Sequence, residues 1–296
     1  MKYKFRRYVL YYLARVFAYL ICFFPLTIAR PIGGLLGRIA FRALPRYRKI
    51  TLANLGAAFG RENTPVQIAA IAEKVFENLG RVGAELLNFP KINRGNIDRI
   101  VDIIGLENLN AALGSGKGVI LVTGHIGNWE LLALAIKLKG YKGAVIARRI
   151  YFDKYDKFLN FLRGVHDVDV IYRDDSPKKI LKVLKDNGII GILADQDVDS
   201  VDGVFVNFFG QPAYTPSGPA ALAAASGARI LPCYIAREGR AHKLFIDDAL
   251  SLDDTGDRQS DLVSNTKKWS NRIEAYIRRY PDQWVWMHRR WKTKDI

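Results

Sequence analysis

The chain has 296 residues, 49% of them hydrophobic, which is enough apolar material to bury a large core. The formal net charge is +16 and is concentrated near the N-terminus, because residues 1–61 contain no Asp or Glu while residues 1–50 hold eleven Lys and Arg. The two cysteines, Cys22 and Cys233, exclude a disulfide framework, and no residues have metal-ligand spacing.

The basic N-terminal segment predicts an anionic partner, either a nucleic acid or a phospholipid surface. Residues 8–29 read YVLYYLARVFAYLICFFPLTIA, a run that is too apolar for a nucleic-acid arm. We therefore expect a membrane lipid as partner and no nucleic acid. Basic residues continue beyond the run and no clean small-x-small cleavage site follows it, which argues against a signal peptide.

The same run is long enough for a spanning helix, which needs about 20 apolar residues. However, Arg15 interrupts the run and Pro25 would break its last turn. Three interpretations stay open: an anchor along the cytoplasmic leaflet with its cations on lipid phosphates, a single span, and a buried core helix. We expect a helical membrane anchor at residues 1–30, followed by one α/β domain at residues 31–296.

Two more helices are predicted before the first strand. Apolar residues recur at helical spacing from Ile50 to Phe59, and again over residues 63–88. At the start of the second helix Asn63 or Thr64 can act as N-cap, and Pro65 suits the first turn. The N-terminal third of the chain is therefore expected to be helical.

The pattern then changes to short apolar runs that alternate with helical segments. Residues 117–123 (KGVILVT) are almost wholly apolar, as in a strand buried on both faces. Further strands are predicted at residues 143–148, 168–172, 188–194, 228–236 and 242–246. Helices are predicted at residues 128–138, 154–165, 176–186, 216–226 and 257–280, with Ser176 as an N-cap. This alternation predicts an α/β fold with a mixed, largely parallel sheet flanked by helices.

In such sheets ligands bind at the carboxyl ends of the strands. Three polar segments follow predicted strands, namely residues 124–130, 148–149 and 195–197. The rule therefore points to these three places as candidate positions of the functional site.

His125 directly follows the first buried strand, in the segment TGHIGNWE. If Gly127 caps the next helix, Glu130 is its third residue and points back toward the imidazole. A carboxylate bonded to one ring nitrogen would fix the tautomer and raise the basicity of the other nitrogen. No nucleophilic Ser or Cys stands beside the pair, so it suits direct deprotonation of a hydroxyl that then attacks an activated acyl group. In the alternative interpretation, Glu130 only caps the helix and His125 only fills a turn.

The remaining histidines and the C-terminal tail carry weaker signals. We interpret His166, His242 and His288 as structural or surface residues. The tail at residues 281–292 (PDQWVWMHRRWK) combines tryptophans with cations. It suits either an interface with lipid phosphates or a packed aromatic tail that orders the last helix.

Taken together, these motifs resemble the bacterial lipid A biosynthesis acyltransferases. The segment GHIGNWE is similar to the family's histidine and acid pair, separated by four residues, after an apolar strand. Residues 194–197 (ADQD) and 204–209 (VFVNFF) are similar to its Asp-x-Asp stretch and the strand that follows. The tail is similar to its Trp-x-His-Arg-Arg signature. The resemblance therefore runs along nearly the whole chain.

The resemblance implies that a fatty acyl chain passes from acyl carrier protein to a hydroxyl of a glucosamine-based lipid A precursor, at the cytoplasmic face of the bacterial inner membrane. It implies His125 as general base and Glu130 as its partner. The expected substrate-binding residues are Arg163, Asn128, Arg148, Asp195 and Asp197. Within this set, Arg163 would bind a substrate phosphate or the thioester oxyanion, and the two aspartates would shape the site or orient basic groups. No cofactor or metal is expected, because alcoholysis of a thioester requires only a base and an oxyanion donor.

Two alternatives remain beside this function. The chain could acylate another glycolipid within the same superfamily, such as a mannosylated phosphoinositide, or it could be a non-catalytic protein that only binds membranes. Glycerol-phosphate acyltransferases share a related pattern, but they usually have Asn before the histidine and Asp as the acid. Gly124 and Glu130 stand at these positions here, which argues against that branch.

Overall fold

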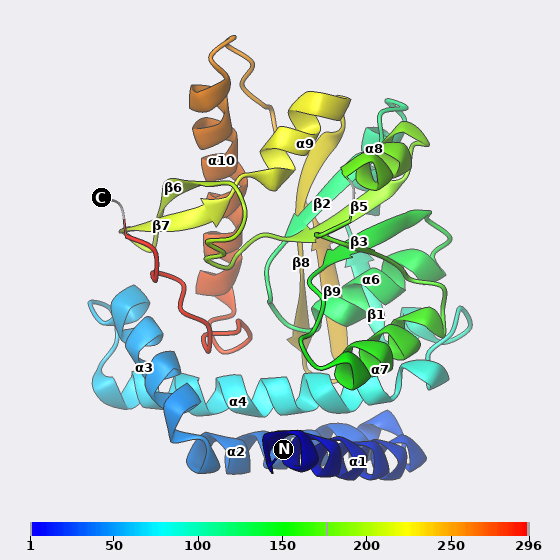
Figure 1. Cartoon of the computed structure of the whole chain (residues 1–296), viewed down its shortest axis with the longest axis vertical. Helices are drawn as coiled ribbons and strands as arrows, with labels where there is room; N and C mark the ends of the chain where they lie inside the picture. The colour runs from blue at the N-terminus through cyan, green and yellow to red at the C-terminus, as the bar shows by residue number, and fades with distance from the viewer. Residues whose placement is uncertain (1, 176, 295–296) are drawn as a thin grey trace.

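The computed structural model describes residues 2–175 and 177–294, so the predicted N-cap Ser176 lies outside the described residues. The predicted fold class is confirmed, because helices flank a mixed and largely parallel sheet (Figure 1). The helical N-terminal third is confirmed as well. Its helices are α1 (Lys2–Phe23), α2 (Leu26–Ala43), α3 (Pro45–Phe59) and α4 (Pro65–Leu87).

Local sequence explains where these helices begin and end. Helix α1 ends before Pro25, which is the N-cap of α2 in an extended conformation. Helix α4 begins with a capping box, in which the Thr64 side chain accepts from the Gln67 amide and the Gln67 side chain accepts from the Thr64 amide. The predicted N-cap at Thr64, with Pro65 in the first turn, and the break at Pro25 are therefore confirmed.

Helix α2 was not predicted, because glycines interrupt its apolar pattern. These glycines let its backbone lie directly on α4. A Cβ atom on Gly33 would lie 2.4 Å from the carbonyl oxygen of Gly80, and one on Gly37 would lie 2.1 Å from that of Phe76. We call Gly33, Gly37 and Gly80 the glycine seam. Because no side chain fits between the helices there, they pack backbone to backbone.

No helix among the described residues is long and apolar enough to cross a membrane. The structure therefore gives no support to the expected helical anchor as a spanning segment. Helix α2 runs through the expected boundary at residue 30 and packs along α4.

The main sheet has seven strands in the order β1-β9-β8-β2-β5-β3-β4, and a separate hairpin joins β6 to β7. All neighbours in the main sheet are parallel except β8 and β9. The strands are β1 (Val101–Ile104), β2 (Val119–Thr123), β3 (Gly143–Ala147), β4 (Asp169–Tyr172), β5 (Ile189–Leu193), β6 (Gly203–Phe208), β7 (Gln211–Pro216), β8 (Arg229–Glu238) and β9 (Ala241–Ile246). The other helices are α5 (Leu106–Leu113), α6 (Trp129–Leu138), α7 (Asp153–Gly164), α8 (Pro177–Lys185), α9 (Gly218–Ser226) and α10 (Arg258–Arg279), with short 3-10 turns at Phe89–Lys91 and Ile97–Arg99.

Strand β2 shows why the sequence of a central strand is an unbroken run of apolar residues. All of its residues are buried. Ile120 and Val122 pack into the core that contains α8, α9 and α10, while Val119 and Leu121 pack into the core that contains α5 and α6. Both faces of the sheet are therefore covered by helices.

The N-terminal helices lie across the carboxyl ends of β2, β5 and β8 (Figure 1). We call this end of the sheet the carboxyl edge. Arg237, near the end of β8, donates to the Glu85 carboxylate on α4, which fixes the helical layer at this edge. The layer therefore lies on the side of the sheet where ligands are expected to bind.

Candidate functional site

The turn from β2 into α6 carries His125 and contains glycines at the two positions where a side chain would collide. A Cβ atom on Gly124 would lie 2.9 Å from Oδ2 of Asp195. Gly127 has φ +57°, and a Cβ atom there would lie 2.0 Å from the carbonyl oxygen of Ile235. The turn is therefore tightly confined on both sides, and we call residues 124–128 the catalytic turn.

The carboxylate that bonds to His125 is Asp195, which follows β5. Oδ1 of Asp195 lies 2.7 Å from Nδ1 of the imidazole, and Oδ2 accepts from the backbone amide of His125 at 2.7 Å. Oδ2 also accepts from the indole Nε1 of Trp284 at 2.7 Å. Asp195 therefore lies at the carboxyl edge, where its carboxylate holds the imidazole of His125 and the indole of Trp284.

The surroundings of Asp195 determine the tautomer of His125. Burial alone would raise the pKa of the Asp195 carboxyl, but the charge and hydrogen bonds of His125 outweigh burial and hold this pKa well below its usual range. The ionised carboxylate can only accept, so the proton lies on Nδ1 and the lone pair on Nε2. No hydrogen-bond partner of Nε2 is found in the described part of the chain, and the His125 side chain is 23% exposed. In the neutral imidazole, the nitrogen that carries the lone pair is therefore accessible.

Glu130 bonds to Arg163 rather than to the imidazole. Nε of Arg163 donates to Oε2 at 2.8 Å, and Nη2 donates to Oε1 at 2.5 Å. The predicted contact assumed that Gly127 caps α6, but the N-cap is Asn128, so Glu130 is the second helical residue and not the third. A side chain at that position is not in the capping-box geometry. The bidentate pair instead joins α6 to α7.

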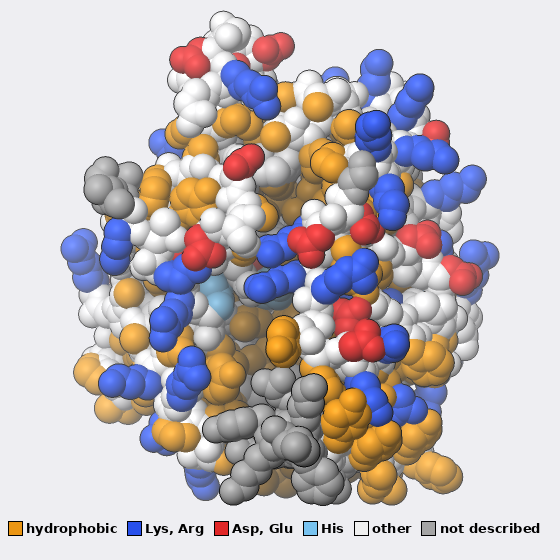
Figure 2. Space-filling model, in the orientation of Figure 1, with side chains coloured by type: hydrophobic (Ala, Val, Ile, Leu, Met, Phe, Trp, Pro, Cys, Tyr) orange, Lys and Arg blue, Asp and Glu red, His pale blue; other side chains and the backbone are white. Residues whose placement is uncertain are grey.

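The other predicted site residues have different surroundings. Arg148 is exposed at the end of β3. Asp197 accepts from the backbone amide and the hydroxyl of Thr293, at 2.7 and 2.8 Å, and so holds the C-terminal tail. Asn128 is fully buried, and both polar atoms of its amide bond to other protein groups, which corrects its expected role in binding substrate. Figure 2 shows Lys and Arg side chains gathered around a hollow on this face, with a histidine at its margin.

Comparison with known proteins decides the family. The family model described as bacterial lipid A biosynthesis acyltransferase matches residues 1–293. The chain belongs to this family. The resemblance inferred from GHIGNWE, ADQD and the tail is therefore confirmed.

Relatives of this family member include enzymes with different acceptors. It is 27% identical to the phosphatidylinositol mannoside acyltransferase of Mycobacterium tuberculosis over 86% of either chain. It is also 27% identical to the lipid A biosynthesis lauroyltransferase of Escherichia coli, over 97% of this chain and 93% of the relative. The Escherichia coli lipid A biosynthesis myristoyltransferase is 23% identical over 89% of this chain and 81% of the relative.

In this family member the C-terminal tail packs against the catalytic turn. This contact was not predicted from the sequence. Trp284 and Trp286 are fully buried, so these two side chains belong to a packed tail and not to a lipid interface. The backbone of the tail pairs with the catalytic turn, because Gly127 donates to the carbonyl of Gln283 and Val285 donates to that of His125. Arg290 is also fully buried and donates to the carbonyl of Tyr214 and the hydroxyl of Thr215. The signal for this role was the tail's high density of tryptophan.

His288 in the tail predicts how the stability of this acyltransferase-family protein depends on pH. Burial lowers the pKa of His288 from its ordinary 6.5 to about 4, and Nδ1 donates to the carbonyl of Val285. Below pH 6.5 the unfolded chain takes up a proton at this residue that the folded chain refuses, so stability is lost as the pH falls toward 4. The loss approaches about 3 kcal/mol, since each pKa unit corresponds to about 1.4 kcal/mol.

Replacing His288 by Asn keeps a donor toward Val285 and removes the titrating ring. We expect the difference in unfolding free energy between pH 7 and pH 4.5 to be smaller in His288→Asn than in the natural protein. Denaturant unfolding followed at both pH values measures this difference. Equal differences in the two proteins would show that another group causes the loss.

Proposed function

We propose that this protein transfers a fatty acyl chain from an acyl carrier protein thioester to a hydroxyl of a lipid A precursor, at the cytoplasmic face of the bacterial inner membrane. The observation that carries the proposal is the His125–Asp195 pair, which leaves Nε2 of the imidazole free at the carboxyl edge. A histidine base held by a buried carboxylate suits proton removal from a hydroxyl.

The reaction follows from this geometry. Nε2 of His125 takes the proton of the acceptor hydroxyl, and the oxygen attacks the carbonyl carbon of the thioester. The new C–O bond forms and the C–S bond breaks, so the ester remains on the lipid and the sulfur leaves as a thiolate. The proton on Nε2 then passes to that sulfur, which regenerates the neutral base. Asp195 stabilises the imidazolium while the proton is held. The proposal includes no metal or cofactor.

Two classes of lipid are candidates for the acceptor. The relatives' names include both lipid A and phosphatidylinositol mannoside acyltransferases. We favour a lipid A precursor because the family model carries that description and the lauroyltransferase match covers 97% of the chain. The alternative acceptor is a mannosylated phosphoinositide, because the chain is also 27% identical to the phosphatidylinositol mannoside acyltransferase of Mycobacterium tuberculosis.

Purified protein incubated with a defined acyl thioester and either acceptor tests the assignment. Mass spectrometry should find one added acyl chain on the lipid A precursor. If an acyl chain is added only to the phosphoinositide, the acceptor is the mannosylated phosphoinositide and not the lipid A precursor. No product with either lipid, and none on other hydroxyl lipids, would contradict the acyltransferase function.

A lysine-rich helix supports an acidic carrier protein as donor. Helix α8 has the sequence PKKILKVLK, in which Ile180 and Leu184 are buried while its four lysines are exposed. Such a face attracts an acidic partner by charge complementarity. Parallel assays with the same acyl chain on acyl carrier protein and on coenzyme A should show faster transfer from the carrier protein. Equal rates would contradict the donor assignment while leaving the reaction itself intact.

The outer faces of α1 and α2 support binding to a membrane surface without a span. Large apolar side chains are exposed there, including Val16, Tyr19, Leu20 and Phe23 on α1 and Ile28, Leu35, Leu36 and Ile39 on α2. Figure 2 shows hydrophobic side chains along the margin where Figure 1 places these helices. Basic side chains such as Arg42 and Arg46 continue the surface and suit anionic headgroups.

Leu35→Asn combined with Ile39→Asn should weaken binding to vesicles that contain anionic phospholipid. Both side chains are more than half exposed, so the folded state should be retained. Each loses an apolar contact with lipid, and we expect at least about tenfold weaker binding in a sedimentation assay. Val66→Asn is the matched control, because Val66 is also exposed but lies at the start of α4. Equal binding of the double variant and the control would contradict this surface.

A further inference from the structure

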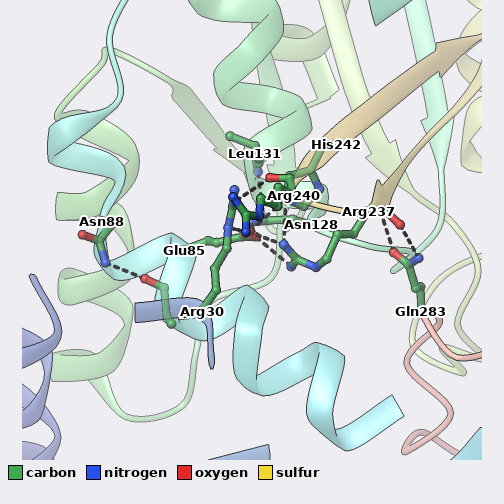
Figure 3. Close-up of polar contacts among 10 residues, drawn as sticks. Arg30, Glu85, Asn88, Asn128, Leu131, Arg237, Arg240, His242 and Gln283 are labelled. Carbon is green, nitrogen blue, oxygen red and sulfur yellow. Dashed lines mark hydrogen bonds and ion pairs between the residues drawn. The ribbon is translucent and has the colours of Figure 1, made fainter. Parts of the chain in front are cut away.

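A buried ionic cluster connects the N-terminal helices to the catalytic turn (Figure 3). Its centre is the Glu85 carboxylate on α4, whose side chain is 1% exposed. We call Glu85 and its four partners Arg30, Arg237, His242 and Asn128 the Glu85 cluster. Nε of Arg30 donates to Oε1 at 2.6 Å, and Nη2 of Arg237 donates to Oε2 at 3.0 Å. Nε2 of His242 lies 2.9 Å from Oε1.

The charged groups around Glu85 keep its carboxylate ionised and therefore hold it in place. Burial alone would raise the pKa of Glu85, but the hydrogen bonds and charges of His242 and Arg237 hold it well below its usual range. An ionised and buried carboxylate must keep its partners, because breaking one such pair leaves a buried charge without compensation. The partners come from α2, β8, β9 and the start of α6, so the position of the carboxylate is set by four elements at once.

Asn128 is the member of the cluster that reaches the active site. It lies in the catalytic turn, between His125 and Glu130. Its Nδ2 donates to Oε2 of Glu85 at 2.8 Å, and its Oδ1 accepts from the Leu131 amide at 3.0 Å as the N-cap of α6. Since both ends of the amide are bonded and the residue is fully buried, its orientation is fixed.

We propose that Glu85 is a positioning residue, which holds the catalytic turn and the first turn of α6 in register with the N-terminal helices through Asn128. This inference rests on the proposed function, because it concerns the placement of His125 and Glu130 for acyl transfer. The hydrogen bond from Asn128 to Glu85 matters for this placement, since a displacement of about 1 Å at a reacting group can cost about a hundredfold in rate.

Glu77 provides an internal comparison on the same helix. It also lies on α4 and accepts from an arginine of α2, with Nε of Arg38 at 2.8 Å from Oε2. Its second partner is Arg81, one turn further along α4. The ion pairs of Glu77 therefore stay within the helical layer. Loss of Glu77 removes an α2–α4 ion pair without touching the catalytic turn, which makes Glu77→Gln the matched control for Glu85→Gln.

The variant Asn128→Ser removes the hydrogen bond to Glu85 and keeps the N-cap of α6. Serine is a good N-cap and can still accept from the Leu131 amide, but its short side chain cannot reach Glu85. We expect Asn128→Ser to lower kcat at least about tenfold with KM changed by less than about threefold, because the machinery is displaced while substrate binding remains. Glu85→Gln should lower kcat in the same way, and Glu77→Gln should stay within about threefold of the natural protein. Assays well below each variant's Tm ensure that folded protein is compared.

The combined variants test whether the two residues act as one unit. Glu85→Gln with Asn128→Ser should be no more than about twofold slower than the slower single variant, whereas the effects of Glu77→Gln and Asn128→Ser should multiply. Multiplying effects in the Glu85 pair, or a natural kcat in Asn128→Ser, would overturn the inference. His125→Ala is assayed alongside. If it keeps the natural rate, the proposed function fails, whereas its inactivity beside a fully active Asn128→Ser overturns the positioning role alone.

Discussion

Replacement of His125 by Ala is expected to reduce acyl transfer at least about a thousandfold, since a positioned general base contributes up to about four orders of magnitude. The imidazole is the group in the catalytic turn with a free nitrogen, and no described residue bonds to that nitrogen. Initial rates of acylated lipid formation, measured by mass spectrometry, give the size of the loss. Binding to lipid vesicles should be unchanged, which distinguishes a catalytic protein from one that only binds membranes.

Replacement of Asp195 by Asn should be nearly as damaging, with a loss of about a hundredfold or more. The amide of Asn would donate to Nδ1 and move the ring proton to Nε2, so the nitrogen facing the substrate could no longer accept one. Asp253→Asn is a suitable control, because it removes another hydrogen-bonded carboxylate, in the loop before α10. Full activity of Asp195→Asn beside an inactive His125→Ala would mean that a different group fixes the tautomer.

Replacement of Glu130 by Met is expected to reduce transfer at least about a hundredfold, although this carboxylate does not bond to the imidazole. The reason is Arg163, whose side chain is only 12% exposed and would lose its counter-charge. Breaking such a pair costs about 3–5 kcal/mol and frees the start of α6 from α7. Thermal unfolding and initial rates should both be measured, and Arg163→Met should show a similar loss.

The double variant Glu130→Met with Arg163→Met decides what the pair does. Two apolar side chains can replace a buried ion pair with little loss of stability. We expect the Tm of the double variant to recover toward the natural value while acyl transfer stays low, because Arg163 is proposed to meet a substrate phosphate or the thioester oxyanion. If transfer recovers together with the Tm, the pair is only structural. Lys157→Met with Asp153→Met is a control, since this exposed pair joins residues of α7 alone.

The strands and most helices were predictable because their signals are local. The apolar run of β2 and the caps of α4 depend on neighbouring residues, and the structure confirms them. Helix α2 was missed, since its glycines are explained only by contact with α4, which is distant in the chain. Strand β1 was missed too, because it has only four residues and two of its side chains are exposed.

The partner of His125 was misassigned for a related reason. Spacing along the chain pointed to Glu130, but the contact arises between neighbouring parallel strands. Thr123 of β2 pairs with Leu193 of β5, so His125 and Asp195 each lie two residues beyond a matched pair. The sequence had placed Asp195 at the correct edge of the sheet. What it lacked was the strand order that puts β5 next to β2.

The glycine seam has a mechanical consequence. At Gly33, Gly37 and Gly80 the backbones of α2 and α4 touch, so no side chain lies between the helices there to absorb a relative shift. Close-packed protein transmits strain rather than dissipating it. A displacement of α2 is therefore expected to move α4 as well, and with α4 the Glu85 carboxylate that bonds to Asn128. We expect the two helices to move as one rigid unit against the carboxyl edge.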